Sequence, residues 1–181
     1  MKVIPTAIPD VLIFEPTVYT DHRGFFFESF NQSRFTRAVA QDVLFVQDNH
    51  SQSRKGVLRG LHYQLQEPQG KLVRVIHGEV FDVAVDIRRS SSTYAKWVGE
   101  ILSAKNRKQF WLPEGFAHGY LVLSESAEIL YKTTRYYAAQ QERSIAWDDK
   151  DLNISWPLEA PVQLSERDRC AGSLAQADLF E

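Results

Sequence analysis

The stretch VFDVAVDI, from Val80 to Ile87, alternates more clearly than any other segment of the chain. In an extended strand its odd-numbered residues, Phe81 to Ile87, share an apolar face. Its even-numbered residues from Asp82 to Asp86 share a more polar face. A period of two is typical of a β-strand that separates two environments, so this segment predicts a strand.

Short runs of β-branched or aromatic residues recur on both sides of this strand, with Gly, Pro and Ser between them. They predict further strands over residues 43–46, 72–76, 97–102, 109–112, 120–123 and 129–134. Helix signals are few, and they favour only two short helices, Asn31 to Ala40 and Ser165 to Phe180. Because strands do not alternate with helices, we expect an all-β sandwich, jelly roll or barrel with a few short peripheral helices.

Composition limits the class of protein. The chain has 181 residues, of which 44% are hydrophobic and 24% charged, with a net charge of -2. These values predict one folded domain over residues 1–181. We expect residues 165–181 to pack on or beside the barrel. The small net charge predicts no overall positive potential that would attract nucleic acid. With Cys170 as the one cysteine, and no long apolar run or secretory signal, we expect a cytoplasmic protein without a membrane span.

Two motifs suggest where the chemistry lies. GVLRGLHYQ, from Gly56 to Gln64, and PEGFAHG, from Pro113 to Gly119, resemble the two halves of the cupin signature. Cupins are jelly-roll barrels with a site in the barrel mouth, and many hold a metal through His-x-His and a later His. Here Gln64 stands in place of the second histidine of that motif, which leaves the imidazoles of His62 and His118. We therefore expect no metal site, and His62 is free for proton transfer.

A closer resemblance covers the chain from Val11 to about Asp168. Besides the two motifs, the segments at 21–28, 47–51, 69–75, 78–88, 130–132, 145–148, 154–157 and 164–168 resemble, in order, the dTDP-4-dehydrorhamnose 3,5-epimerases. This resemblance implies a cupin jelly-roll (double-stranded β-helix) barrel and a homodimer. It also implies conversion of dTDP-4-keto-6-deoxy-D-glucose to dTDP-4-keto-L-rhamnose without cofactor or metal. That reaction belongs to dTDP-L-rhamnose biosynthesis, which feeds bacterial surface polysaccharides such as O-antigen lipopolysaccharide.

The resemblance also implies catalytic roles. An imidazole titrates near neutral pH and suits a general base, which is the role implied for His62, with Asp168 holding its tautomer. Lys71 would stabilise the enolate oxygen, and Tyr131 would donate a proton from the opposite face. From strand alternation alone, we expect Asp82 to hold Lys71 charged. Taken singly, His62 and Tyr131 could equally be core residues, and Lys71 an ordinary turn lysine.

Substrate-binding positions are carried over in the same way. A diphosphate favours arginine forks. The matching positions, besides Lys71, are Arg23, Glu28, Gln47, Asn49, Arg59, His118, Glu142 and Arg167, the last standing where the family often has lysine. Phe26 and Tyr136 could offer flat faces to thymine or sugar, although hydrophobic packing is an equally good interpretation for both.

Three alternatives remain open at this point. A related enzyme could act on another dTDP-4-keto sugar, or invert only C3 or only C5, with the same motifs. A sugar-binding cupin would need neither His62 nor Tyr131 for proton transfer. A metal-dependent cupin oxygenase is disfavoured by Gln64.

Overall fold

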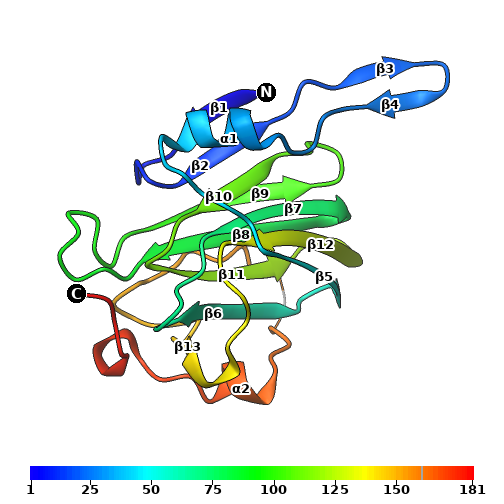
Figure 1. The fold of residues 1–181 in the computed structure, drawn as a ribbon. Coiled ribbons are helices and arrows are strands. Elements are labelled where there is room, and N and C mark those ends of the chain that lie inside the picture. Colours follow the sequence, from blue (N-terminus) through cyan, green and yellow to red (C-terminus); the bar gives the residue numbers. More distant parts are fainter. Residues whose placement is uncertain (160) are drawn as a thin grey trace.

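Two antiparallel sheets face each other in the computed structural model, which describes residues 1–159 and 161–181 (Figure 1). In order, the first sheet contains β1 (Lys2–Pro5), β2 (Leu12–Glu15), β10 (Gln109–Leu112), β7 (Lys71–His77), β12 (Ser126–Thr133) and β5 (Gln47–Arg54). The second contains β13 (Glu142–Ser144), β6 (Leu58–Gln64), β11 (Phe116–Val122), β8 (Glu79–Asp86) and β9 (Trp97–Ser103). The predicted all-β, cupin-type jelly roll is confirmed.

The alternating stretch forms β8, between β11 and β9, and both of its faces are buried. Ala84 belongs to the core between the two sheets, together with residues such as Val73 and Phe110. Val83 and Val85 instead belong to a second core on the outer face of the five-stranded sheet. The more polar face of β8, which carries Asp82, is therefore the one that looks into the barrel.

A helix covers the outer face of the six-stranded sheet. This helix, α1 (Gln32–Val39), begins where the Asn31 side chain accepts a hydrogen bond from the Arg34 backbone, as its sequence predicts. Phe35 anchors it, with its ring centroid 5.5 Å from Phe14 and 5.0 Å from Trp111. These ring contacts hold α1 against the six-stranded sheet.

The C-terminal part of the chain covers the outer face of the five-stranded sheet, where Leu152, Trp156 and Leu174 pack in one cluster with Val83 and Val85. The predicted helix from Ser165 to Phe180 is wrong in length. Ser165 caps α2 (Glu166–Arg169), and only the 3₁₀ turn η2 (Leu174–Gln176) follows. Beyond Cys170 the backbone hydrogen-bonds to the barrel instead: the Gly172 carbonyl accepts from Ala146, and the Phe180 carbonyl accepts from Arg89.

Several strand predictions also need correction. Residues 43–46 form no strand, because Val43 and Phe45 pack against the α1 cluster instead. The strand lies just beyond them in β5, whose sequence QDNHSQSR has no apolar alternation to reveal it. The strand predicted to begin at Tyr120 is β11, which already begins at Phe116.

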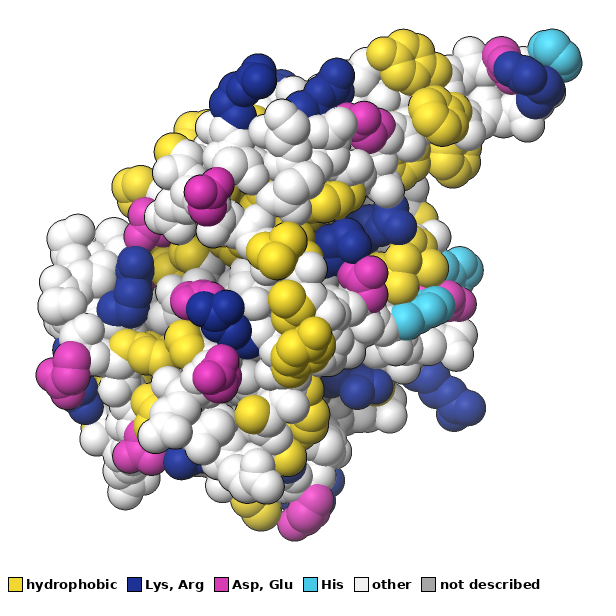
Figure 2. Space-filling model, in the orientation of Figure 1, with side chains coloured by type: hydrophobic (Ala, Val, Ile, Leu, Met, Phe, Trp, Pro, Cys, Tyr) yellow, Lys and Arg dark blue, Asp and Glu magenta, His cyan; other side chains and the backbone are white. Residues whose placement is uncertain are grey.

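One hairpin stands away from the barrel. Its strands, β3 (Tyr19–Asp21) and β4 (Gly24–Phe26), pair only with each other and project from the body of the molecule (Figure 1). Figure 2 shows hydrophobic side chains along this projection and charged and histidine side chains at its tip. Phe26 is 70% exposed, and Tyr19 and Phe25 are also exposed. Among the described residues, no helix is long and apolar enough to span a bilayer.

Candidate active site

The fold brings His62 and Asp168 together from positions 106 residues apart. His62 lies on β6, Asp168 lies on α2, and Nε2 of the imidazole is 2.5 Å from Oδ1 of the carboxylate. Burial acts to raise the pKa of Asp168, but hydrogen bonds from His62 and Ser165 and the charge of Arg167 outweigh it, so this pKa is lowered. An ionised carboxylate thus holds the His62 ring, which remains partly open to solvent.

A second imidazole–carboxylate pair lies on the neighbouring strands. His118 on β11 stands directly beside His62 in the sheet register, and its Nε2 is 2.9 Å from Oδ1 of buried Asp82 on β8. The predicted pairing of Asp82 with Lys71 is therefore incorrect as a direct contact. Within the described residues, the ion pair of Asp82 is with His118, and its charge acts on Lys71 at longer range.

Lys71 begins β7 and is buried, not solvated as a turn lysine would be. Gly70 lets the Trp111 ring pack directly against the backbone before Lys71, because a Cβ at this position would lie 2.6 Å from that ring. Burial lowers the pKa of the Lys71 ammonium to about 8, against the opposing charges of Glu142 and Asp82. At neutral pH the group is a cation inside the barrel.

Tyr131 lies on the sheet that faces His62. It projects from β12 and packs against the core between the sheets. Burial raises the pKa of its phenol, as do Tyr120 and the charge of Glu142, so the hydroxyl keeps its proton at neutral pH. Asn49 of β5 pairs with Tyr131 in the register, and its side-chain carbonyl accepts a hydrogen bond of 2.9 Å from Gln47.

Glu142, which begins β13, links α2 to the segment between β12 and β13. Its Oε2 lies 2.5 Å from the Arg167 guanidinium and accepts a hydrogen bond of 2.5 Å from the Tyr137 hydroxyl. Burial acts to raise the pKa of Glu142, but Tyr137, Arg167 and the charge of His62 lower it overall. The carboxylate is thus ionised beside the His62–Asp168 pair.

Tyr137 joins this group through its hydrogen bond to Glu142, whereas the sequence reasoning named only its neighbour Tyr136. Tyr136 is 69% exposed, and its backbone carbonyl accepts a hydrogen bond from Gln64 on β6. The adjacent tyrosines lie between β12 and β13, outside any strand, so no alternation rule could choose between them.

The charge of Arg59 on β6 acts on the Tyr131 phenol, and the Arg59 Nε donates to the Ser53 hydroxyl at 3.1 Å. Three predicted residues do not join the group within this chain. Arg23 and Phe26 lie on the projecting hairpin, where Arg23 pairs with Asp21 at 2.6 Å. Glu28, just beyond the hairpin, pairs with Arg34 at 3.1 Å.

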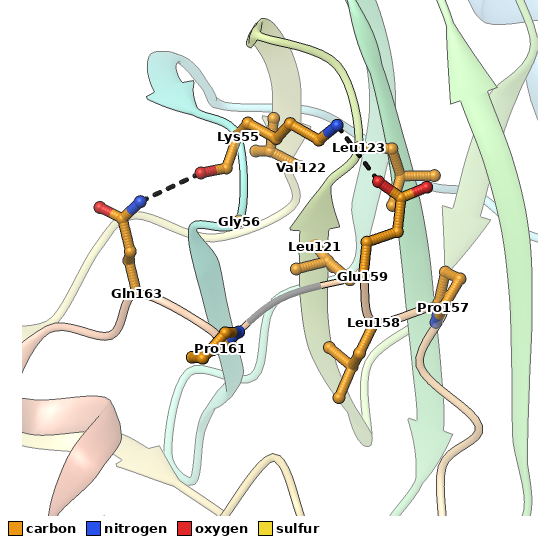
Figure 3. Close-up of a pocket in the computed structure, with 10 residues that line it drawn as sticks. All are labelled: Lys55, Gly56, Leu121, Val122, Leu123, Pro157, Leu158, Glu159, Pro161 and Gln163. Carbon is orange, nitrogen blue, oxygen red and sulfur yellow. Dashed lines mark hydrogen bonds and ion pairs between the residues drawn. The ribbon is translucent and has the colours of Figure 1, made fainter.

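A separate cavity of about 360 Å³ lies on the outside of the barrel, between the start of β6, the end of β11 and a group formed by residues 157–159, Pro161 and Gln163 (Figure 3). It is lined mainly by apolar side chains such as Leu121 and Pro157, and a Lys55–Glu159 ion pair of 3.2 Å crosses it. None of the predicted site residues lines this cavity, so the candidate active site is the barrel mouth.

An imidazole on one sheet, held by a carboxylate of α2, and a protonated tyrosine on the facing sheet suit proton removal and return on a bound substrate. Within a jelly-roll barrel, they define a cupin-type isomerase. The family model for dTDP-4-dehydrorhamnose 3,5-epimerase matches residues 5–176. The chain belongs to this family.

Individual comparisons agree with that assignment. A dTDP-4-dehydrorhamnose 3,5-epimerase of Shigella flexneri is 61% identical over 181 residues, 99% of each chain. The structure of a Legionella pneumophila 3,5-epimerase in complex with dTDP-4-keto-L-rhamnose is 52% identical, with a TM-score of 0.97 over 99% of this chain and 97% of that one. A 3'-monoepimerase from Streptomyces bikiniensis in complex with dTDP-quinovose is 33% identical, with a TM-score of 0.89 over 94% and 87%.

Proposed function

We propose that this protein is a dTDP-4-dehydrorhamnose 3,5-epimerase. It inverts C3 and C5 of dTDP-4-keto-6-deoxy-D-glucose and yields dTDP-4-keto-L-rhamnose for dTDP-L-rhamnose synthesis. The observation that carries the proposal is the contact of 2.5 Å between Asp168 and His62, which lies on the sheet that faces Tyr131. Inversion requires a proton to leave one face of a carbon and another to arrive at the opposite face.

His62 acts as the base. Its imidazole takes the proton from the carbon next to the C4 ketone, and the C–H electron pair moves onto the ketone oxygen to form an enolate. Asp168 is ionised and in contact with the ring, so it orients the base and stabilises the imidazolium that forms.

Lys71 stabilises the enolate. Its buried ammonium places a positive charge where the water that would screen it is excluded, which makes it effective against charge that develops on an oxygen. The imidazole of His118, held by Asp82, supplies a second polar group in the same part of the barrel.

Tyr131 completes each inversion. Its hydroxyl donates a proton to the enolate carbon from the side away from His62, and the electron pair returns from the oxygen to form the new C–H bond. The phenolate regains its proton from solvent, and His62 releases its proton to solvent. The same set acts once at C3 and once at C5.

Binding would use the polar groups of the mouth, namely Arg59, Gln47, Asn49, Glu142 and Arg167, with Arg59 suited to the diphosphate.

The projecting hairpin explains the remaining positions. Arg23 and Phe26 are exposed and lie on the hairpin that projects from the barrel of their own chain. We therefore infer a homodimer in which they, with Glu28, serve the substrate in the partner's mouth.

The remaining features follow from the same proposal. The enzyme works as one cytoplasmic domain over residues 1–181, without cofactor, because side chains supply every proton and charge that the reaction needs. The main alternative is a 3-monoepimerase, like the Streptomyces bikiniensis relative. A sugar-binding cupin is less well supported, because binding alone would not require a base and an acid on facing walls.

Incubation with dTDP-4-keto-6-deoxyglucose in deuterated water tests the proposal. We expect deuterium at both C3 and C5 of the product. Label at C3 alone would make the protein a 3-monoepimerase, and no label at either carbon would leave a binding protein.

A further inference from the structure

We propose that Gln64 is a positioning residue that fixes the segment Arg135–Gln141, and with it Tyr137, at the mouth of the barrel. This proposal rests on the proposed function, because its effect is read in the binding of the nucleotide sugar. Gln64 stands where many cupins have a metal-binding histidine, and the reaction itself gives it no task.

The side chain of Gln64 is fully used by backbone groups. It is 3% exposed, and its Nε2 donates to the Glu67 carbonyl at 2.8 Å and to the Tyr136 carbonyl at 3.3 Å. Its Oε1 accepts a hydrogen bond of 2.8 Å from the Ala138 backbone. The amide therefore holds the segment on both sides of Tyr137.

Gln64 is also attached rigidly to the catalytic strand. It lies two residues after His62 on β6, and it pairs with Glu142 of β13 in the sheet register. Gln64 thus connects the strand that carries the base to the segment whose Tyr137 hydroxyl donates to Glu142.

Other bonds hold the two ends of the segment: the Thr133 hydroxyl donates to the Arg135 carbonyl at 2.9 Å, and the Leu65 backbone donates to the Gln141 carbonyl at 3.0 Å. Arg135, Tyr136 and Tyr137 are exposed, so no buried side chain of theirs anchors it. Two other glutamine side chains also bind the segment. The Tyr137 backbone donates to Gln47 at 3.0 Å, and the partly exposed Gln69 donates to the Arg135 carbonyl at 2.9 Å. A buried amide with several partners contributes more than an exposed one, because its loss leaves buried polar groups unpaired.

An amide suits this task better than the histidine it replaces. A neutral imidazole offers one donor and one acceptor, whereas the Gln64 amide has two donor hydrogens and an acceptor oxygen. The three backbone groups that it contacts match this pattern.

The test compares Gln64→Met with Gln163→Met. Methionine keeps the length and bulk of glutamine but forms none of these bonds. Gln163 also donates to a backbone carbonyl, that of Lys55 at 3.1 Å, but it is exposed and lies by the outer cavity, so it controls for the Gln→Met change away from the barrel mouth (Figure 3). For Gln64→Met we expect the KM for the keto sugar and the Kd for dTDP to rise roughly 5- to 100-fold, as the loss of such buried bonds implies. We expect kcat to change less than about threefold, because the His62–Asp168 pair is untouched.

Coupling to Tyr137 separates positioning from simple destabilisation. If Gln64 acts through this segment, Gln64→Met should raise KM much less in a Tyr137→Ala background than in the wild type. Gln64→Asn, which keeps an amide but shortens its reach, replaces the methionine variant if the latter does not fold, with the same expectation. Unchanged KM and Kd, or a KM effect of equal size in both backgrounds, would overturn the proposal. Loss of epimerisation in the wild type would count instead against the proposed function.

Discussion

His62 and Asp168 show what residue-scale reasoning could and could not supply. The resemblance to the family names both residues, but only the fold shows their contact, because a separation of 106 residues carries no geometric information. The contact of Asp82 with His118 instead of Lys71 was missed for the same reason: strand alternation gives the face on which a side chain lies, not its partner across the sheet.

The first residue-scale prediction concerns the base. His62→Ala should abolish solvent exchange at both C3 and C5, because the same imidazole removes both protons. The change leaves buried Asp168 without the imidazole that it contacts, so the melting temperature should fall, whereas dTDP affinity should stay close to wild type. Proton NMR of the substrate in deuterated water gives the exchange rates. Near-normal exchange at either carbon would remove His62 as its base.

The second concerns the pH dependence that Lys71 imposes. Its ammonium is the active form, and burial lowers its pKa to about 8, so kcat/KM should fall as the pH rises through that value. Lys71→Arg should move this alkaline limb upward, since a guanidinium stays charged at any pH the enzyme tolerates. The quantity to compare is the pH at which kcat/KM falls, not the size of kcat/KM in either protein. A limb that stays in place in the arginine variant would assign it to another group.

At the scale of elements, the strongly alternating β8 and the capped α1 could be predicted, whereas β5 could not. The latter is an edge strand, and its alternating side chains are polar because one face lines the mouth, so the usual apolar signal is missing. The helix after Ser165 was overestimated because capping signals mark where a helix begins, while here tertiary hydrogen bonds at Gly172 set its end.

The projecting hairpin provides a prediction at this scale. If Arg23 serves the partner's site, then Arg23→Ala and His62→Ala proteins, each nearly inactive alone, should regain activity when mixed. A mixed dimer would contain one site with both residues intact, so random exchange of subunits predicts roughly a quarter of wild-type activity. Each variant alone at the same total concentration is the control. No recovery, with subunit exchange shown by mass spectrometry, would place Arg23 in the site of its own chain.

At the scale of the whole molecule, the side chains that stand at the metal-binding positions of many cupins here bind other groups of the same chain. His62 and His118 each bind a carboxylate, and Gln64 binds backbone groups. Activity should therefore survive prolonged dialysis against a strong chelator. An active preparation whose turnover disappears on chelation and returns with a divalent metal would contradict the cofactor-free mechanism.

The central claim is that a base and an acid act from facing sheets, and Tyr131→Phe tests it most directly. The change removes one hydroxyl and keeps the ring, so packing against the inner core is preserved. Without the acid, His62 can still remove a proton and return a solvent deuteron to the same face. We therefore predict that net epimerisation falls roughly 10²- to 10⁴-fold, as for loss of a positioned acid, while deuterium exchange measured on the same sample falls much less. Equal loss of exchange and inversion, or no loss of either, would contradict this account.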